Sequence, residues 1–275
     1  MRAVDFEYDN QYLSDYGFII CDFDFSSGTS TVNSGSNITF NKIPHNSGKR
    51  YSLSSTQYDS CVTTTFDICK DPDIYHGNDM EITNDEYRDI IRWLNRREFL
   101  KFHVIDAYCD SDGFRDTCYF NASFNAEKVL IDGKLYGVRL TMETNMPFGY
   151  GQERSVSWTF TDSDVVKILR DVSDEIGYIY PTVIISINQD GNLSLYNEME
   201  NCTTYIRNCK VGEVITMNGE MKTITTTYAN HDICNDFNYE FFRIGNTIND
   251  RNNRISASLP CSVVIKYAPI IKDTP

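Results

Sequence analysis

Long hydrophobic runs are absent from this 275-residue sequence. No stretch approaches the ~18 consecutive apolar residues that cross a bilayer, and the richest run, Ile176–Ile187, is interrupted by Pro181. The first residues, Met1–Glu7, contain no apolar segment of the kind found in secretory signal peptides. We therefore expect neither a membrane-spanning helix nor export through a signal peptide.

Basic residues are also scarce. The chain carries 25 Lys and Arg against 39 Asp and Glu, which gives a formal net charge of -14 at pH 7. The acidic excess is present in both 1–150 and 151–275, so it is not confined to a tail. Because phosphates and anionic lipids are met by basic surfaces, we expect no specific nucleic-acid binding and no insertion into a membrane.

Metal-binding and redox motifs are missing as well. The nine cysteines contain no C-x-x-C pair, which excludes paired zinc knuckles and thioredoxin-like sites, and we interpret them as reduced, half-buried thiols. The H-E-x-x-H motif is absent, and no two histidines have metal-ligand spacing. The four histidines are His45, His76, His103 and His231.

Catalytic signatures are not found either. The sequence has no G-x-S-x-G, Walker or G-x-G-x-x-G motif. The segment Asp110–Asp116 is loosely similar to a calcium loop, but Gly113 is at the fourth position and Asn121 replaces the final Glu. We interpret it, like Asn188–Asn192, as a polar turn. The sequence predicts no catalytic, cofactor-binding or metal residues and no enzyme, although a glycosidase with two carboxylates stays open.

Alternation of apolar and polar residues dominates the chain and predicts half-buried strands. The alternating segments include Val62–Ile68, Cys118–Asn125, Tyr136–Glu143, Val183–Ile187 and Val263–Tyr267. Asp132-Gly133 lies between two such segments and supplies the positive φ values of a two-residue hairpin turn. The sequence therefore predicts a mainly β fold.

One segment breaks this pattern and predicts a helix over 84–97. Thr83 and Glu86 form a capping box at its start. Helical spacing produces an apolar stripe of Tyr87, Ile90, Ile91 and Leu94. We expect this helix to lie over an open sheet.

A basic stripe runs beside the apolar one and consists of Arg88, Arg92 and Arg96. One interpretation is a solvated face whose charges are favoured by the helix dipole. The other is a basic patch that meets an acidic neighbour in an assembly. Both interpretations stay open.

A lapse in alternation over 146–158 predicts a boundary between two domains, 1–150 and 151–275. Short strands with frequent turns predict a β-sandwich or jelly roll in the second domain. The segment Asp162–Asp171 fits a strand or a short helix. We assign the last strand, within 263–275, to the second domain by default.

Carbohydrate binding by the second domain is a further hypothesis, because jelly rolls often bind sugars through an exposed ring. Trp93 falls in the predicted helix and Trp158 directly follows the boundary. The tyrosines that fit this role are Tyr196, Tyr205, Tyr228 and Tyr239.

The order of several segments supplies a resemblance that covers most of the chain. These segments are Asp15–Phe23, Arg92–Leu94, Lys134–Gly137, Asn145–Phe148, Ser173–Pro181, Gly212–Ile215, Asp236–Asn238 and Pro260-Cys261. In this order the chain resembles the distal tail proteins, or baseplate hub proteins, of long-tailed bacteriophages. The resemblance rests on a diffuse pattern of strands and turns.

The resemblance implies an N-terminal β-sandwich or split-barrel domain with one helix, and a C-terminal galectin-like jelly-roll sandwich. It implies a hexameric ring at the distal end of the tail tube that continues the DNA channel. The galectin sugar motif has no match in 173–275, so the resemblance carries over the fold without lectin activity.

The implied partners are other copies of the chain, the tail tube protein, a tail-tip hub protein or tail-associated lysin, and receptor-binding or baseplate proteins. The implied location is the tail tip of the virion, after assembly in the host cytoplasm. The alternative function is a polysaccharide-binding module of the tail tip, either a lectin or an adhesin.

Overall fold

The computed structural model describes residues 3–23, 37–46, 48–106, 118–163 and 165–272, and the chain divides into two compact units. The first unit comprises Met1–Gly151 with Lys272–Pro275, and the second comprises Gln152–Ile271. The sequence-based division after residue 150 lies one residue from this one. Within the described residues, no helix has the length and apolar character needed to cross a membrane.

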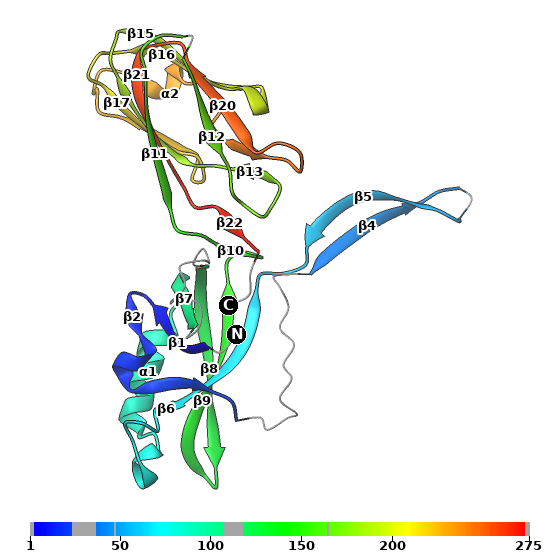
Figure 1. Ribbon diagram of the computed structural model, residues 1–275, viewed down its shortest axis with the longest axis vertical. Helices are drawn as coiled ribbons and strands as arrows, with labels where there is room; N and C mark the ends of the chain where they lie inside the picture. Colours follow the sequence, from blue (N-terminus) through cyan, green and yellow to red (C-terminus); the bar gives the residue numbers. More distant parts are fainter. Residues whose placement is uncertain (1–2, 24–36, 47, 107–117, 164, 273–275) are drawn as a thin grey trace. The chain divides into compact units, whose positions relative to one another are not determined.

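The first unit is built on one antiparallel sheet with the strand order β2-β1-β7-β8-β9-β6-β3 (Figure 1). Its strands are β1 (Ala3–Tyr8), β2 (Gln11–Tyr12), β3 (Phe18–Cys21), β6 (Thr63–Lys70), β7 (Leu100–Asp106), β8 (Phe120–Ile131) and β9 (Lys134–Thr144). The unit also contains β4 (Ile38–Pro44), β5 (Tyr51–Tyr58), β10 (Gly149–Tyr150) and the helix α1 (Asn84–Leu94).

Aromatic side chains from distant strands of the seven-stranded sheet meet in one core, which shows that the sheet is curled. The ring of Phe6 on β1 lies 5.8 Å from that of Phe66 on β6 and 5.4 Å from that of Phe102 on β7. Trp93 of α1 stacks on Phe6 at 5.6 Å, and its Nε1 donates to the carbonyl oxygen of Tyr8 at 3.1 Å. This aromatic cluster joins the helix to the concave side of the sheet.

The helix begins as the sequence predicts and ends earlier. Thr83 Oγ1 accepts from the Glu86 amide at 3.3 Å, and the Glu86 carboxylate accepts from the Thr83 amide at 2.8 Å, so the capping box is confirmed. The predicted end at residue 97 is wrong, because α1 stops at Leu94. The Arg96 side chain instead donates to the Trp93 carbonyl oxygen at 3.1 Å and closes the last turn.

Of the hairpins β8–β9 and β4–β5 in the first unit, the sequence predicts only the first. Asp132 (φ 50°) and Gly133 (φ 77°) form the expected two-residue turn between β8 and β9. Strands β4 and β5 form a separate two-stranded ribbon that the alternation does not reveal.

The second unit is a β-sandwich. One sheet has the order β11-β21-β14-β17-β18, the other has the order β12-β20-β15-β16, and β13 pairs with β19. Their bounds are β11 (Arg154–Phe160), β12 (Val166–Arg170), β13 (Gly177–Ile179), β14 (Thr182–Ile187), β15 (Gly191–Asn197), β16 (Cys202–Cys209), β17 (Val214–Asn218), β18 (Thr223–Thr226), β19 (Ile244–Asn246), β20 (Asn252–Ala257) and β21 (Cys261–Tyr267). The short elements are α2 (Ile233–Asp236) and β22 (Ile270–Ile271).

The two sheets of the sandwich share one hydrophobic core, because alternate residues of their strands are buried. Val183 and Ile185 of β14 belong to the same buried cluster as Leu193 and Leu195 of β15. The mainly β fold class, with β-sandwich architecture and one main helix, is confirmed.

The structure also settles two assignments near the edges of the second unit. The ambiguous segment Asp162–Asp171 contains a strand, β12. The strand β21 pairs with β11 and β14, so the last long strand belongs to the second unit. Lys272 groups with the first unit instead, and its ammonium lies 5.9 Å from the centre of the Tyr58 ring.

Candidate functional site

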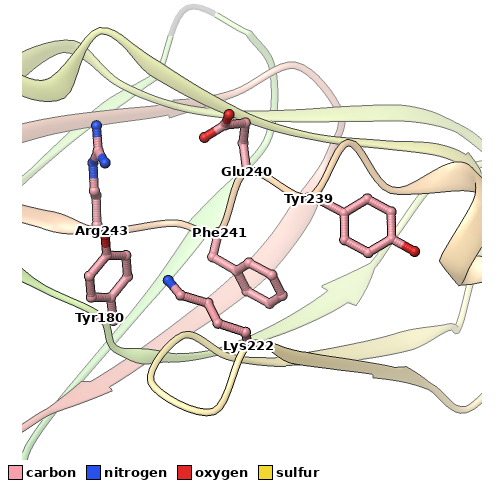
Figure 2. A pocket seen from close by; sticks show the side chains of 6 residues that line it. All are labelled: Tyr180, Lys222, Tyr239, Glu240, Phe241 and Arg243. Atoms are coloured by element: carbon pink, nitrogen blue, oxygen red, sulfur yellow. The ribbon is translucent and has the colours of Figure 1, made fainter.

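An open pocket of about 280 Å³ on the second unit combines aromatic and charged side chains (Figure 2). Its lining residues are Tyr180, Lys222, Tyr239, Glu240, Phe241 and Arg243. They come from the segment before β14, the β17–β18 turn and the segment between α2 and β19. Residues far apart in the sequence therefore meet at this pocket.

Tyr239 provides an exposed ring at the pocket. Its side chain is 63% exposed, and its backbone has a φ of 60°, which is unusual for a bulky residue. The hydroxyl donates to the Cys234 carbonyl oxygen at 2.9 Å, and the ring lies 5.4 Å from that of Phe237. The ring is thus held in place although it faces solvent.

Cationic side chains of the pocket lie over two further rings, Tyr180 in the pocket and Tyr178 outside its lining. The Lys222 ammonium lies 3.3 Å from the centre of the Tyr180 ring. The Arg243 guanidinium lies 4.4 Å from the centre of the Tyr178 ring, and its Nε donates to the Glu200 carboxylate at 2.9 Å. Exposed rings beside fixed donors and acceptors suit a ligand that has both apolar C–H faces and hydroxyl groups.

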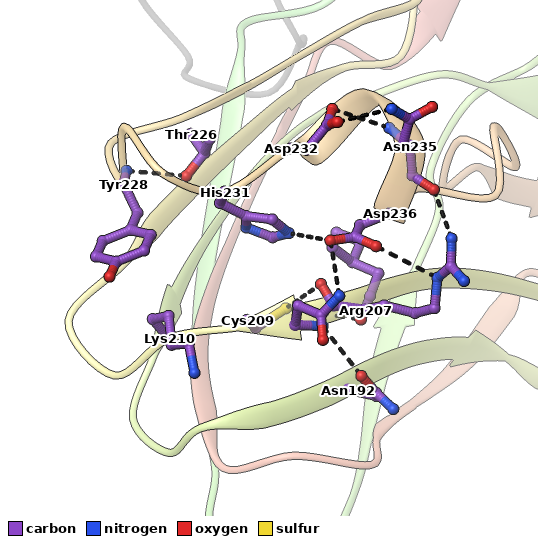
Figure 3. A network of polar contacts seen from close by, with 12 residues as sticks. Asn192, Arg207, Cys209, Lys210, Thr226, Tyr228, His231, Asp232, Asn235 and Asp236 are labelled. Atoms are coloured by element: carbon purple, nitrogen blue, oxygen red, sulfur yellow. Dashed lines mark hydrogen bonds and ion pairs between the residues drawn. The ribbon is translucent and has the colours of Figure 1, made fainter.

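A second polar cluster in this unit centres on the buried His231 (Figure 3). His231 Nδ1 lies 2.5 Å from Glu213 Oε1, and His231 Nε2 lies 3.4 Å from Asp236 Oδ2. Glu213 also accepts from the Lys210 amide at 2.9 Å and from the Thr226 hydroxyl. These contacts join β18 and α2 to the segment that directly precedes β17, and the side chains of His231 and Glu213 are almost fully shielded from solvent.

Cys209 is a buried thiol that lies beside this cluster. Burial, reinforced by the negative charge of Glu213, raises the pKa of its thiol to about 12. The thiol donates to the Ile206 carbonyl oxygen at 3.6 Å. Because the thiolate is the reactive form of cysteine, this arrangement stabilises the fold and does not resemble a cysteine–histidine catalytic pair.

Metal ligands do not gather in the described parts of the chain. No group of three or more His, Cys, Asp or Glu side chains there has an arrangement that holds a metal ion. The eight cysteines among these residues are free thiols.

Family comparisons give the chain an assignment. A model of a phage tail protein N-terminal domain matches residues 1–146, and a model of a phage tail C-terminal domain matches residues 148–267. The chain belongs to this family of phage tail proteins.

A solved structure has a similar fold. It is the crystal structure of the SPP1 Dit (gp 19.1) protein, described as a paradigm of the hub adsorption apparatus in Gram-positive infecting phages. The TM-score is 0.64 at 13% identity, and the match covers 97% of this chain and 99% of that chain. No curated protein sequence has a significant match to the chain. The resemblance to phage tail proteins is confirmed by the family match, and the Dit similarity shows the fold.

Of the four tyrosines that the sequence suggests for sugar binding, one lines the pocket of this phage tail protein, namely Tyr239. The other three are Tyr196 and Tyr205, which are half-buried in strands, and Tyr228, which is exposed outside the pocket. Trp93 is buried in the first core, Trp158 is partly buried against the second core, and neither lines the pocket.

The histidines named from the sequence are dispersed. His45 Nε2 lies 2.6 Å from Ser52 Oγ, and the His103 ring lies 5.2 Å from that of Tyr119. His76 is exposed. His231 is the one buried in the cluster of Figure 3.

The arginine stripe of α1 is exposed and partly paired within the chain. Arg92 contacts Asp89 at 3.1 Å, Arg96 lies 3.9 Å from Asp9, and Arg88 is exposed. These contacts fit the solvated-face interpretation for two of the three arginines.

Of the two segments that we interpret as polar turns from the sequence, the structure describes one. Within Asn188–Asn192, Asp190 accepts from the Val211 amide at 2.8 Å and from Lys210 at 3.2 Å, so this turn fastens a neighbouring loop. The backbone hydrogen bond from Val211, together with Lys210, lowers the pKa of Asp190. The segment Asp110–Asp116 lies outside the described residues.

Sequence reasoning missed most of the pocket. Tyr180, which lines the pocket, alternates with Tyr178 before Pro181, and this alternation places the two rings on one face and is the signal that points to Tyr180. Lys222 and Arg243 carry no such signal, because only the tertiary fold brings their segments together.

Proposed function

We propose that this phage tail protein is a structural, non-enzymatic hub at the distal end of the tail tube, where it joins the tube to the tail tip. The observation that carries this proposal is the Dit-like fold, which extends over almost the full length of both chains. The phage tail family match supports the same role.

The hub is a homo-hexameric ring formed by the first unit, and it continues the channel through which DNA leaves the tail. Closed rings of identical chains use one head-to-tail interface repeated around an axis. The net charge of -14 favours this role, because an acidic lining repels phosphate and lets DNA pass without specific binding.

The second unit is a galectin-like sandwich that docks other tail-tip components. Its partners are a tail-tip hub protein or tail-associated lysin, and receptor-binding or baseplate proteins, while the ring itself contacts the tail tube protein. The self-contained core of this unit supports an accessory role, because it folds around its own hydrophobic cluster. Assembly takes place in the host cytoplasm.

Gold labelling of intact phage particles tests this proposal. An antibody raised against the full chain, detected by electron microscopy, is expected to mark the tail end opposite the capsid. Labelling along the whole tail or at the capsid contradicts the distal position. Absence of the chain from purified particles contradicts the structural role altogether.

A second candidate function is saccharide binding, and the exposed, fixed ring of Tyr239 in its pocket favours it. Glycan arrays probed with the full chain are expected to give signals that Tyr239→Ala removes. Tyr228→Ala is the matched control, because Tyr228 is also exposed and lies outside the pocket. Equal signals from both variants contradict this site.

A further inference from the structure

The ribbon of β4 and β5 has no partner strand among the described residues. Its two strands pair with each other from Ile38↔Tyr58 to Pro44↔Tyr51, and neither pairs with the seven-stranded sheet. Within the described part of the chain, the backbone groups on both outer edges of the ribbon therefore have no strand partner. An isolated two-stranded ribbon is at best marginally stable in water, so this element needs a contact beyond itself.

The ribbon is amphipathic. Directly opposite residues of an antiparallel pair share a face, and successive residues alternate between faces. A bulge at Ser54 shifts the register between Asn41 and Lys42 and keeps the apolar residues of both strands on one side. The apolar face contains Ile38, Phe40, Pro44, Tyr51, Leu53 and Tyr58, with the polar Lys42 and Thr56 among them.

The opposite face is polar. Its members are Thr39, Asn41, Ser52, Ser55 and Gln57, and Ile43 is the exception. Asn41 Nδ2 donates to Ser55 Oγ at 3.0 Å across this face. The polar face is therefore suited to solvent, and the apolar face is the one that requires a partner.

The apolar face is open to solvent in the single chain. Phe40 is 53% exposed, Leu53 is 57% exposed and Tyr51 is 63% exposed. Monomeric proteins seldom leave several large apolar side chains together on the surface, and such patches mark interaction sites. At the base of the ribbon, the Tyr58 ring meets the Phe148 ring edge to face at 5.5 Å, which fixes the position where the ribbon starts.

The charge of the ribbon is opposite to that of the chain. Between Ile38 and Tyr58 the sequence has Lys42, Lys49 and Arg50 and no acidic residue, whereas the whole chain has a net charge of -14. The surface that best complements this basic, apolar ribbon is therefore acidic. Another copy of the same chain offers such a surface at equal concentration.

We infer that the β4–β5 ribbon is an assembly arm, and that its apolar face packs on a neighbouring copy of this chain. This inference rests on the proposed ring and adds the element that links adjacent subunits. The contact is head-to-tail, because the ribbon of one copy meets a different surface on the next. Each subunit thus gives one arm and receives one.

Substitutions on the two faces of the ribbon test the arm in the full chain. Phe40→Asp places a charge on the apolar face, and Gln57→Asp places the same charge on the polar face as a matched control. Light scattering is expected to show that Phe40→Asp requires about tenfold or more protein to assemble, because it loses the burial of one large side chain. Gln57→Asp is expected to assemble like the wild type.

Photo-cross-linking gives a readout that does not depend on a destabilising substitution. The photoreactive residue p-benzoylphenylalanine replaces Tyr51 on the apolar face or Gln57 on the polar face of the purified chain. Tyr51 is expected to give cross-linked species of two chains, and Gln57 is expected to give far fewer. A product within one chain, at 31.7 kDa, contradicts the arm and shows that the ribbon folds back on its own subunit.

These experiments distinguish a failure of the arm from a failure of the proposed ring. A wild-type chain that assembles together with a Phe40→Asp chain that assembles equally well overturns the arm and leaves the ring intact. A wild-type chain that stays at 31.7 kDa overturns the ring on which the arm depends.

Discussion

At the residue scale, a buried ionisable side chain in each unit, Glu213 or Lys70, connects neighbouring segments through several polar contacts. In the second unit, Glu213 receives contacts from His231, Thr226 and the Lys210 backbone while it is shielded from water. In the first unit, the buried Lys70 ammonium contacts Glu86 at 2.8 Å and donates to the carbonyl oxygens of Asp79 and Glu81. Removing one member of such a set leaves the others without a partner, which costs more than the pair contributes.

The first prediction concerns Glu213→Ala, which leaves His231 buried beside a cavity. We expect the free energy of unfolding of the second unit to fall by about 3–5 kcal/mol. The chain has two tryptophans, so in a Trp93→Phe background Trp158 reports on the second unit alone during urea unfolding. Glu220→Ala, at an exposed glutamate, is the control and should change little. A loss below about 1 kcal/mol for Glu213→Ala would contradict the structural role of the cluster.

The second prediction concerns the pH dependence of the first unit. Burial raises the pKa of Glu86, but the hydrogen bonds from Lys70 and Thr83 outweigh it, so the net pKa is lowered from 4.5. A lowered pKa in the folded state means that this carboxylate stabilises the fold fully above about pH 4.5 and ceases to do so as the pH falls further. The wild type should therefore lose its advantage over Glu86→Gln below that pH, as measured by Trp93 fluorescence in a Trp158→Phe background. An advantage that stays constant down to acid unfolding would contradict this assignment.

At the scale of elements, α1 depends on its first turn. The third prediction is that Thr83→Ala lowers the free energy of unfolding of the first unit by about 1 kcal/mol, because the cap hydroxyl is lost. Thr83→Ser keeps this hydroxyl and serves as the control. Urea unfolding followed by Trp93 fluorescence compares the two variants, and equal losses would show that the hydroxyl does not stabilise the helix.

The elements that the sequence predicts well are those governed by local rules. Alternation indicates β6, β8, β9, β14 and β21, because a strand with one buried face repeats every two residues. The capping box locates the start of α1 for the same reason. The end of α1 was misplaced because basic residues after Leu94 also suit a helix C-terminus, whereas the chain turns there toward β7.

The ribbon and the pocket escape prediction for different physical reasons. The bulge at Ser54 interrupts the alternation of β5, and serine and threonine dilute its apolar residues, so no periodic signal emerges. The pocket gathers Tyr180, Lys222 and Tyr239 from separate segments. Its composition is therefore a product of tertiary packing, which a single sequence does not encode locally.

At the scale of the whole molecule, the chain has two separate hydrophobic cores, and the proposed hub assigns a different task to each of the two units. The first unit combines a curled sheet, a helix and an amphipathic ribbon, and we propose that this unit forms the ring. The second unit presents an open aromatic pocket and keeps its polar cluster buried. In the proposed ring, the basic ribbon of one copy meets the acidic surface of the next, so we expect assembly to weaken as salt increases.

The mass of the full chain in solution tests the ring most directly. Multi-angle light scattering at low ionic strength, over a range of protein concentrations, is expected to reach a plateau at about 190 kDa, which corresponds to six chains of 31.7 kDa. The plateau should not rise further with concentration, because a closed ring leaves no free interface. A mass of 31.7 kDa at every concentration, or one that grows without limit, would contradict the account.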